Sequence, residues 1–407
     1  MNSKKILIVS HQFLPFVSPR TTRWNMLINE FINKGHEVTV LSGTNPENIE
    51  KNFKILYFGN KQFSSNISKV RKNSQDSSNN IFRKISYSIL KKFYRFIFKT
   101  FSWPDYAMFW TLTVFKNRKN IKNNYDIIIS VSLPFTSHLC AYILNKRIGA
   151  EWIMDVGDPF SLKINSQENN KIIYSFLNKF YERKFYQNAS KIIFTHNEVA
   201  ELHQDEFNID NSKIVIGYPI AEVSEKIINK SANFNYKIMP LRIGYFGAFT
   251  KSVREPYNYI NNIANSFDEE IKHLWYINEE SKKYFASIIN TSSHKFLDIV
   301  PRDEALEVMV SEMHILLSIG NLNKYQMPSK VVEYLSLGKP VLHFAEINDD
   351  PLYNFEKLFN NLKIINNKTT KNDLENYFVE VKEKRFEINL ENFDNNFSAY
   401  KLVNKLI

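Results

Sequence analysis

The sequence predicts an α/β protein with two domains, each built on a doubly wound parallel sheet. A length of 407 residues exceeds what one ordinary core needs, and 43% hydrophobic residues are enough to fill two cores. Short apolar runs typical of buried strands alternate with helical periodicity twice along the chain. A polar segment bounded by Pro219 and Pro240 separates the two series. We therefore expect an N-terminal domain over residues 1–219, a linker over 220–240 and a C-terminal domain over 241–391.

The N-terminal domain opens with the order strand, helix, strand. Residues 6–9 form a short apolar run, Gly35 favours a helix end, and residues 38–41 form a second apolar run. The intervening helix is indicated by apolar residues at the spacing of one helix face, namely Trp24, Leu27, Ile28 and Phe31. Later elements continue the alternation, with strands at 127–131, 152–154 and 191–195 and helices at 139–144 and 174–186. In such a sheet ligands gather at the carboxyl ends of the strands.

The C-terminal domain repeats this alternation. The expected strands lie at 242–246, 274–277, 296–300, 315–319 and 341–344, and the expected helices at 256–264 and 303–313. Residues 392–407 read as a closing helix.

Charge and cysteine content limit the possible partners and compartment. The net charge of +11 admits nucleic acid, an anionic membrane surface or a phosphorylated substrate. The single cysteine, Cys140, excludes a disulfide framework and favours a reducing compartment. The apolar run near the N-terminus is too short for a signal peptide or a membrane span. A cytoplasmic protein is expected.

Residues 326–344, QMPSKVVEYLSLGKPVLHF, are the most informative segment of the chain. Pro328 suits the first position of a helix, and Gly338 suits the left-handed backbone that closes it. The amides of the first turn, beginning at Ser329, would then be unpaired beside Lys330, with Glu333 one turn further along. This arrangement predicts a seat for a phosphorylated ligand with hydroxyl groups nearby.

The same segment resembles the donor half of the family 4 glycosyltransferases. Members carry the pattern Pro-x-Lys-x-x-Glu-Tyr-(Leu/Met)-Ala-x-Gly-x-Pro-Val, which stands here as Pro328, Lys330, Glu333, Tyr334, Leu335, Ser336, Gly338, Pro340 and Val341. Many relatives have a second glutamate eight positions earlier, at the donor sugar, where this chain has Tyr325. The resemblance implies the GT-B architecture, in which two Rossmann-like domains face each other across a cleft and a final helix, here 392–407, crosses back to the first domain. It also implies a retaining hexosyltransferase.

Breaking a nucleotide-sugar bond releases a diphosphate, whose charge must be held by a metal or by fixed cations. The sequence has no Asp-x-Asp motif, His-x-x-x-His pair or cysteine pair, so we expect no metal and no other cofactor. The loop after Gly247, with Lys251 and Arg254, resembles the basic loop of the family and would act with Lys330, although either loop charge alone could be only solvated. Glu333 would hold the ribose hydroxyls.

The N-terminal domain offers two candidate catalytic residues. The segment WIMDVGDPF at 152–160 resembles Trp-x-x-Asp-x-Arg-Asp-Pro-Trp of a subgroup that makes surface polysaccharides. Asp158 would orient the acceptor or steady positive charge on the sugar, and the alternative is a simple Asp-Pro turn with a helix cap. His138 could reach the acceptor hydroxyl, but a lone histidine beside an apolar helix is more often packed, and the same holds for His11.

A basic, aromatic insertion is expected over about 64–110. Residues 64–80 are polar, and basic residues then alternate with apolar ones without any acid, at Arg83, Lys84, Lys91, Lys92, Arg95 and Lys99. Such a stretch could bind an anionic membrane, bind nucleic acid, or form a helical pair that covers the sheet. The resemblance favours the membrane, because such enzymes commonly extend a polyprenyl-diphosphate-linked glycan.

The prediction is therefore a glycosyltransferase of bacterial surface polysaccharide biosynthesis, peripheral at the inner face of the plasma membrane. It would take a sugar from a UDP- or GDP-linked donor to a glycan acceptor and would not bind nucleic acid. Two alternatives stay open: a nucleotide-sugar epimerase of the same architecture, and a non-catalytic partner or scaffold protein.

Overall fold

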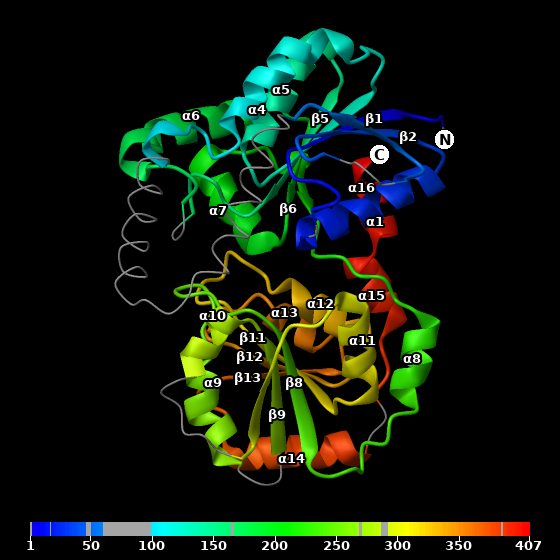
Figure 1. The fold of residues 1–407 in the computed structure, drawn as a ribbon, viewed down its shortest axis with the longest axis vertical. Helices are drawn as coiled ribbons and strands as arrows, with labels where there is room; N and C mark the ends of the chain where they lie inside the picture. The colour runs from blue at the N-terminus through cyan, green and yellow to red at the C-terminus, as the bar shows by residue number, and fades with distance from the viewer. Residues whose placement is uncertain are drawn as a thin grey trace, which may run out of the picture. The chain divides into compact units, whose positions relative to one another are not determined.

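The computed structural model describes residues 2–16, 18–45, 50–59, 99–163, 167–267, 271–285, 292–383 and 386–407. The chain divides into two compact units (Figure 1). Unit 1 consists of Met1–Gly217 with Val403–Ile407, and unit 2 consists of Tyr218–Leu402. The polar stretch 64–80 and most of the basic, aromatic insertion lie outside the described residues. No described helix combines the length and the apolar character that crossing a bilayer requires.

Unit 1 contains a parallel sheet of seven strands in the order β3-β2-β1-β4-β5-β6-β7. The strands are β1 (Lys5–Ser10), β2 (Glu37–Ser42), β3 (Lys54–Tyr57), β4 (Ile127–Val131), β5 (Glu151–Gly157), β6 (Lys191–Phe194) and β7 (Ile214–Ile216). The helices are α1 (Pro19–Asn33), α4 (Met108–Asn117), α5 (Thr136–Ile148), α6 (Lys171–Asn188) and α7 (Asn197–Phe207). The strands and helices predicted for this part of the sequence are confirmed.

Helix α1 shows why the local sequence folds as it does. Its predicted apolar face is buried at Trp24, Leu27, Ile28 and Phe31. Ser18 caps its first turn, because the Ser18 hydroxyl accepts a hydrogen bond from the Thr21 amide at 3.1 Å. Gly35 follows the helix with a φ of +84°, a left-handed conformation that a glycine adopts without strain. The chain can therefore turn directly into β2.

Unit 2 contains a parallel sheet of six strands in the order β10-β9-β8-β11-β12-β13. The strands are β8 (Leu241–Gly247), β9 (Ile271–Ile277), β10 (His294–Leu297), β11 (Ile315–Ile319), β12 (Val341–Phe344) and β13 (Leu362–Ile365). The helices up to α14 are α8 (Glu225–Ala232), α9 (Tyr257–Asn262), α10 (Glu279–Lys282), α11 (Arg302–Ser311), α12 (Ser329–Leu335), α13 (Tyr353–Glu356) and α14 (Lys371–Glu383). The fold class is therefore the predicted one, with two Rossmann-like units.

Three segments differ from their predictions. Strand β10 ends at Leu297, and Ile299 beyond it is exposed, so the apolar run at 296–300 is only partly strand. The segment predicted as a linker carries helix α8, which is joined to α11 by an ion pair between Lys230 and Glu307. The final helix is two helices, α15 (Leu390–Phe397) and α16 (Ala399–Leu406). They separate at Ser398, which is extended and whose hydroxyl accepts from the Lys401 amide at 3.2 Å, so that it caps the second helix.

Each sheet has one point where the strand order reverses. In unit 1 this switch point lies between β1 and β4, and in unit 2 it lies between β8 and β11. Loops that leave neighbouring strand ends in opposite directions open a space for a ligand at such a point. The loops after these strands are therefore where each unit is expected to bind.

Candidate functional site

The loops after β8 and β11 are held together at the switch point of unit 2. The Leu322 amide donates to the Val253 carbonyl at 2.8 Å, and Arg254 Nε donates to Asn321 Oδ1 at 3.1 Å. A tight turn precedes Arg254, because the amides and carbonyls of Thr250 and Arg254 bond to each other at 2.9 and 3.0 Å. Arg254 thus spans the two loops that flank the switch point.

Lys330 lies against the end of β8. A Cβ built on Gly247 would be 3.4 Å from Lys330 Cε, so the absence of a side chain at Gly247 leaves room for the lysine stem. Burial lowers the pKa of Lys330, Glu333 opposes this shift, and the charge of Arg254 adds to it. Four predicted residues, Gly247, Arg254, Lys330 and Glu333, therefore come together; we call them the α12 cluster.

Tyr334 explains why Lys330 reaches this position. Its hydroxyl donates to the Phe246 carbonyl and accepts from the Phe246 amide, both at 3.3 Å, and its ring is buried. These bonds tie α12 to the end of β8 and orient the first turn of the helix. Neither Tyr334 nor Asn321 was assigned a role from the sequence, because their partners are distant in the chain.

Glu333 is already engaged at one oxygen. Arg302, at the start of α11, donates to Glu333 Oε1 from Nε at 3.1 Å and lies 3.0 Å from it through Nη2. The Arg302 side chain is exposed, and solvent-facing ion pairs contribute about 0–1 kcal/mol. A ligand hydroxyl could displace this arginine at low cost.

The other predicted donor residues lie at the edge of the α12 cluster. Ser329 begins α12 and is exposed, and Lys251 is exposed in the turn before Arg254. Tyr325 lies in the loop after β11, where its amide donates to Asn323 Oδ1 at 3.0 Å. Within the described residues, no hydrogen bond or ion pair joins Lys251 or Tyr325 to Lys330.

Helix α12 begins one residue later than predicted, so that Pro328 lies just before it. Helix α12 begins at Ser329, and Pro328 precedes it with a φ of −65° and an extended ψ of 102°. The prediction that Pro328 is the first helical residue is therefore wrong, because its ψ lies outside the helical region. The expected left-handed backbone at Gly338 is confirmed by its φ of +66°.

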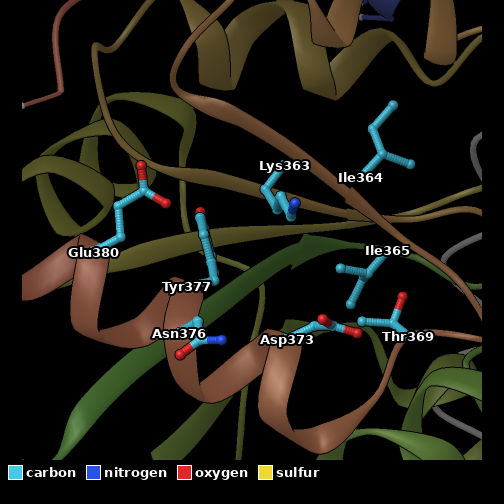
Figure 2. Close-up of a pocket in the computed structure, with 8 residues that line it drawn as sticks. All are labelled: Lys363, Ile364, Ile365, Thr369, Asp373, Asn376, Tyr377 and Glu380. Carbon is cyan, nitrogen blue, oxygen red and sulfur yellow. The ribbon is translucent and has the colours of Figure 1, made fainter.

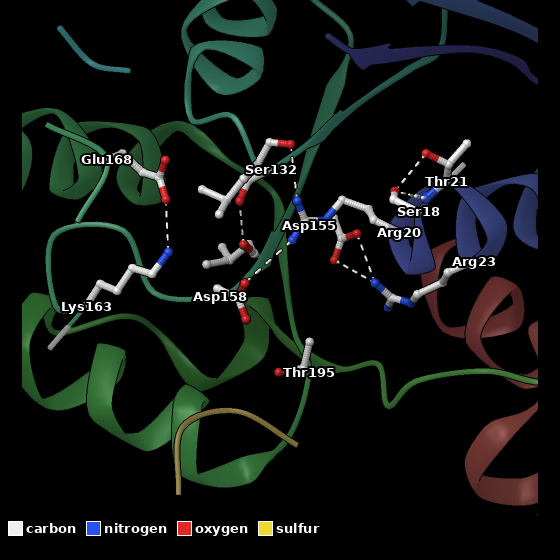
Figure 3. Close-up of polar contacts among 12 residues, drawn as sticks. Ser18, Arg20, Thr21, Arg23, Ser132, Asp155, Asp158, Lys163, Glu168 and Thr195 are labelled. Atoms are coloured by element: carbon white, nitrogen blue, oxygen red, sulfur yellow. Dashed lines mark hydrogen bonds and ion pairs between the residues drawn. The ribbon is translucent and has the colours of Figure 1, made fainter. Parts of the chain in front are cut away.

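Asp158 meets an arginine at the switch point of unit 1 (Figure 3). Its carboxylate lies 3.9 Å from Arg20 Nη2, and Arg20 Nη1 donates to the Leu133 carbonyl at 3.1 Å. Gly157 has a φ of +62°, and a Cβ there would be 3.1 Å from the same guanidinium nitrogen. The pattern Trp-x-x-Asp-x-Arg-Asp-Pro-Trp has an arginine at the position of Gly157. In this chain the Arg20 guanidinium lies beside that position. The side chains of Arg20 and Asp158 are 27% and 36% exposed, so both can meet a solute.

Asp155, the other aspartate of this segment, is buried. Its carboxylate faces the Arg23 guanidinium (Figure 3). It accepts two hydrogen bonds from Arg23 Nη1, at 3.0 and 2.9 Å, and one from Trp24 Nε1 at 2.5 Å. Arg23 Nη2 also donates to the Gly217 carbonyl at 3.0 Å. The group fixes α1 to the carboxyl end of β5 and therefore positions Arg20 and Asp158 without touching a ligand.

The two candidate histidines point into the protein. His138 is 1% exposed, its Nδ1 lies 2.7 Å from the Ser130 hydroxyl, and burial lowers its pKa to about 3. It cannot reach an acceptor, so we do not retain it as a catalytic residue. The His11 ring packs edge-on against the Trp110 ring with centroids 5.1 Å apart, and burial lowers the pKa of His11 to about 4. Both histidines are neutral at physiological pH and belong to the packing of unit 1.

A pocket of about 320 Å³ lies elsewhere in unit 2, between β13 and α14 (Figure 2). It is lined by Lys363, Ile364, Ile365, Thr369, Asp373, Asn376, Tyr377 and Glu380. None of the predicted site residues contributes to it. Across the residues that the structure describes, no three histidine, cysteine, aspartate or glutamate side chains group as metal ligands.

Comparison with known proteins identifies the fold. No protein-family model matches the chain, and no curated protein matches it in sequence. Solved structures match it over nearly their whole length. A glycosyltransferase from Rickettsia africae is 13% identical with a TM-score of 0.64, covering 100% of this chain and 97% of that one.

Two further matches were solved with UDP. HepE from Anabaena, in complex with UDP, is 11% identical with a TM-score of 0.60, covering 100% of this chain and 98% of that one. A TarM mutant from S. aureus, in complex with fondaparinux, alpha-GlcNAc-glycerol and UDP, is 11% identical with a TM-score of 0.61, covering 99% of each chain. These likenesses show that the chain has the GT-B fold of glycosyltransferases.

Proposed function

We propose that the protein is a glycosyltransferase that moves a sugar from a nucleotide-sugar donor to a glycan acceptor. The observation that carries the proposal is the α12 cluster, in which Lys330 and Arg254 flank Gly247 at the switch point of a GT-B unit. Every structure compared above is a glycosyltransferase in name or binds UDP, which supports the same reading.

The donor would bind with its diphosphate on Lys330 and Arg254 and its ribose at Glu333. Gly247 leaves the backbone open to the phosphates, and Lys330 is partly desolvated before the ligand arrives. A desolvated cation interacts more strongly with an anion than a solvated one does. Ser329, Lys251 and Tyr325 would contact the outer parts of a UDP- or GDP-linked donor.

The acceptor would bind at unit 1, with Asp158 beside its reactive hydroxyl or near the positive charge that develops on the sugar ring. The Arg20 guanidinium, 3.9 Å from this carboxylate, would keep it oriented. We further propose the retaining chemistry of family 4, in which no strong base is needed, so that Asp158 serves by position and charge.

The acceptor class and location complete the proposal. We propose a polyprenyl-diphosphate-linked glycan of bacterial surface polysaccharide biosynthesis, reached from the cytoplasmic face of the plasma membrane. The basic, acid-free composition of residues 81–99 supports an anionic surface as partner. No structural observation favours an epimerase or a non-catalytic scaffold.

A screen of nucleotide sugars tests the proposal. A donor at a hundred times its dissociation constant should stabilise the folded protein by about 2.7 kcal/mol, which thermal shift detects. The donor that gives the largest shift should then be turned over, slowly to water and faster with an acceptor glycan. Interconversion of the donor sugar without release of nucleotide would indicate an epimerase, and binding without turnover of any donor and acceptor would indicate a scaffold.

Turnover should not require a divalent metal. The fixed charges of Lys330 and Arg254 can hold the departing diphosphate, as a metal does in other enzymes. We expect the rate of nucleotide release in excess chelator to stay within about twofold of the untreated rate, a change below 0.5 kcal/mol in barrier. Loss of turnover that magnesium or manganese restores would contradict this assignment.

A further inference from the structure

Helix α6 of unit 1 exposes a run of large apolar side chains. Ile172 is 95% exposed and Phe176 is 81% exposed, and Ile173 and Phe180 are about half exposed. Phe101, which is 72% exposed, belongs to the segment beside the start of the helix. We call these five residues the α6 apolar face. Contiguous exposed side chains of this size mark an interaction surface on a folded protein.

The geometry of the helix places these side chains on one side. At 100° per residue, Ile172, Ile173, Phe176 and Phe180 fall within a sector of about 100°. The rings of Phe176 and Phe180 stack with centroids 6.4 Å apart. The rest of the circumference carries the buried residues, Asn178, Glu182, Phe185 and Tyr186. The apolar face is therefore not the core side of the helix.

The segment around Phe101 is attached to the same end of α6. The Asn170 amide donates to the Lys99 carbonyl at 3.0 Å, and the Tyr174 hydroxyl donates to the Thr100 carbonyl at 2.7 Å. Further along, Trp103 Nε1 donates to Asn178 Oδ1 at 3.0 Å. These bonds hold Phe101 beside the first turns of α6, which Figure 1 shows along the outside of unit 1.

Cations predominate beside this face, and one of them, Lys179, is paired with Glu206 of α7 at 2.7 Å. The second half of α6 carries Lys179, Arg183 and Lys184, and Arg183 falls in the same angular sector as the apolar side chains. The one acidic residue of the helix, Glu182, is buried and accepts from the Tyr186 hydroxyl at 2.7 Å. An apolar face continued by cations matches an anionic lipid surface better than an ordinary protein surface.

We propose that the α6 apolar face docks on an anionic lipid bilayer, with Ile172, Phe176 and Phe101 at the boundary between headgroups and acyl chains. Arg183 and Lys184 then meet the lipid phosphates. The proposal deepens the proposed function, on which it rests, by naming the surface that brings unit 1 to a lipid-linked acceptor.

Vesicle flotation of the full-length chain tests the proposal. The protein should float with vesicles that mix phosphatidylcholine and phosphatidylglycerol, and less so as salt rises. The double variant Ile172→Ser, Phe176→Ser should lower the partition coefficient at least about tenfold, because two large side chains no longer leave water on binding. A control pair in unit 2, Val379→Ser with Leu390→Ser, replaces two apolar side chains that are about half exposed and should leave partition unchanged.

A second variant tests the charge separately. Arg183→Gln with Lys184→Gln should weaken binding to the mixed vesicles about tenfold or more, since each cation near an anionic surface contributes about fivefold in affinity. If the wild type binds vesicles of phosphatidylcholine alone as well as it binds the mixed vesicles, the assignment of an anionic lipid surface as the partner is wrong. Unchanged flotation of the Ile172→Ser, Phe176→Ser variant would overturn the docking face. A dimer that this variant dissociates, with no flotation of the wild type, would assign the face to a second copy of the chain.

Nucleotide binding, measured by thermal shift on the same preparations, separates this proposal from the proposed function. Vesicle binding without any nucleotide binding would leave the docking face in place and remove the donor site. Nucleotide binding without vesicle binding would do the reverse.

Discussion

Replacing Lys330 by alanine should weaken the binding of the donor nucleotide by tenfold or more. Lys330 lies over Gly247 with its charge partly desolvated, and the diphosphate would lose one charge-assisted contact. Such a contact is worth about 1.5–3 kcal/mol, and each 1.4 kcal/mol is a factor of about ten in the dissociation constant. Titration calorimetry with the free nucleoside diphosphate measures this effect directly.

The matched control is Lys295→Ala, which removes an exposed lysine from β10 in the same unit. It should leave the dissociation constant unchanged. Glu333→Ala should also weaken binding about tenfold, by loss of the ribose contact and not of the phosphate contact. Compounds that lack the ribose, such as inorganic diphosphate, should therefore distinguish the two variants. If both variants bind nucleotide like the wild type while they remain folded, the α12 cluster is not the donor site.

The pH dependence of binding follows from the lowered pKa of Lys330. Burial disfavours its charged form, so the free protein loses this charge at a lower pH than an ordinary lysine does. A diphosphate binds the charged form better and raises the pKa again. Affinity should therefore fall as the pH rises through the alkaline range, and Lys330→Arg, which stays charged, should reduce that fall.

The fold was largely predictable because buried parallel strands read as continuous apolar runs. Strands β1, β4 and β11 are buried throughout or nearly so, and each has only one or two polar residues. The bounds of strand β10 were harder to predict, because only part of the apolar run at 296–300 pairs with β9. The extended Ser398 also could not be foreseen, since the helical periodicity of residues 390–406 continues across it.

The site was predictable only where its residues are close in sequence. Lys330 and Glu333 share one helix, and their common side follows from the helical repeat. Arg254 with Asn321 and Arg20 with Asp158 are pairs that the fold brings together from distant segments. The α6 apolar face escaped notice for another reason: apolar residues at helical spacing normally indicate a core, and only the packing of α6 shows which side faces water.

Replacing Asp155 by alanine should destabilise unit 1 by about 3–5 kcal/mol, the cost of leaving one partner of a buried ion pair uncompensated. Asp155 and Arg23 are both buried, and the Trp24 indole nitrogen would also lose its acceptor. Asp155→Asn keeps an oxygen that can accept from Trp24 but removes the negative charge that pairs with Arg23. Its loss of stability should therefore be smaller than that of Asp155→Ala. Urea unfolding followed by tryptophan fluorescence measures the effect, because every tryptophan except Trp275 lies in unit 1.

Asp158 provides the matched control three residues along the same segment. Its ion pair with Arg20 spans 3.9 Å between side chains that are 27% and 36% exposed, and such pairs contribute about 0–1 kcal/mol. Asp158→Asn should therefore leave the free energy of unfolding within about 1 kcal/mol of the wild type and lower sugar transfer. Asp155→Asn should instead lower stability, with transfer lost only as far as the protein unfolds. A folded, stable Asp155→Ala protein would show that Arg23 finds another partner, and the division of the two aspartates into a structural and a functional residue would be wrong.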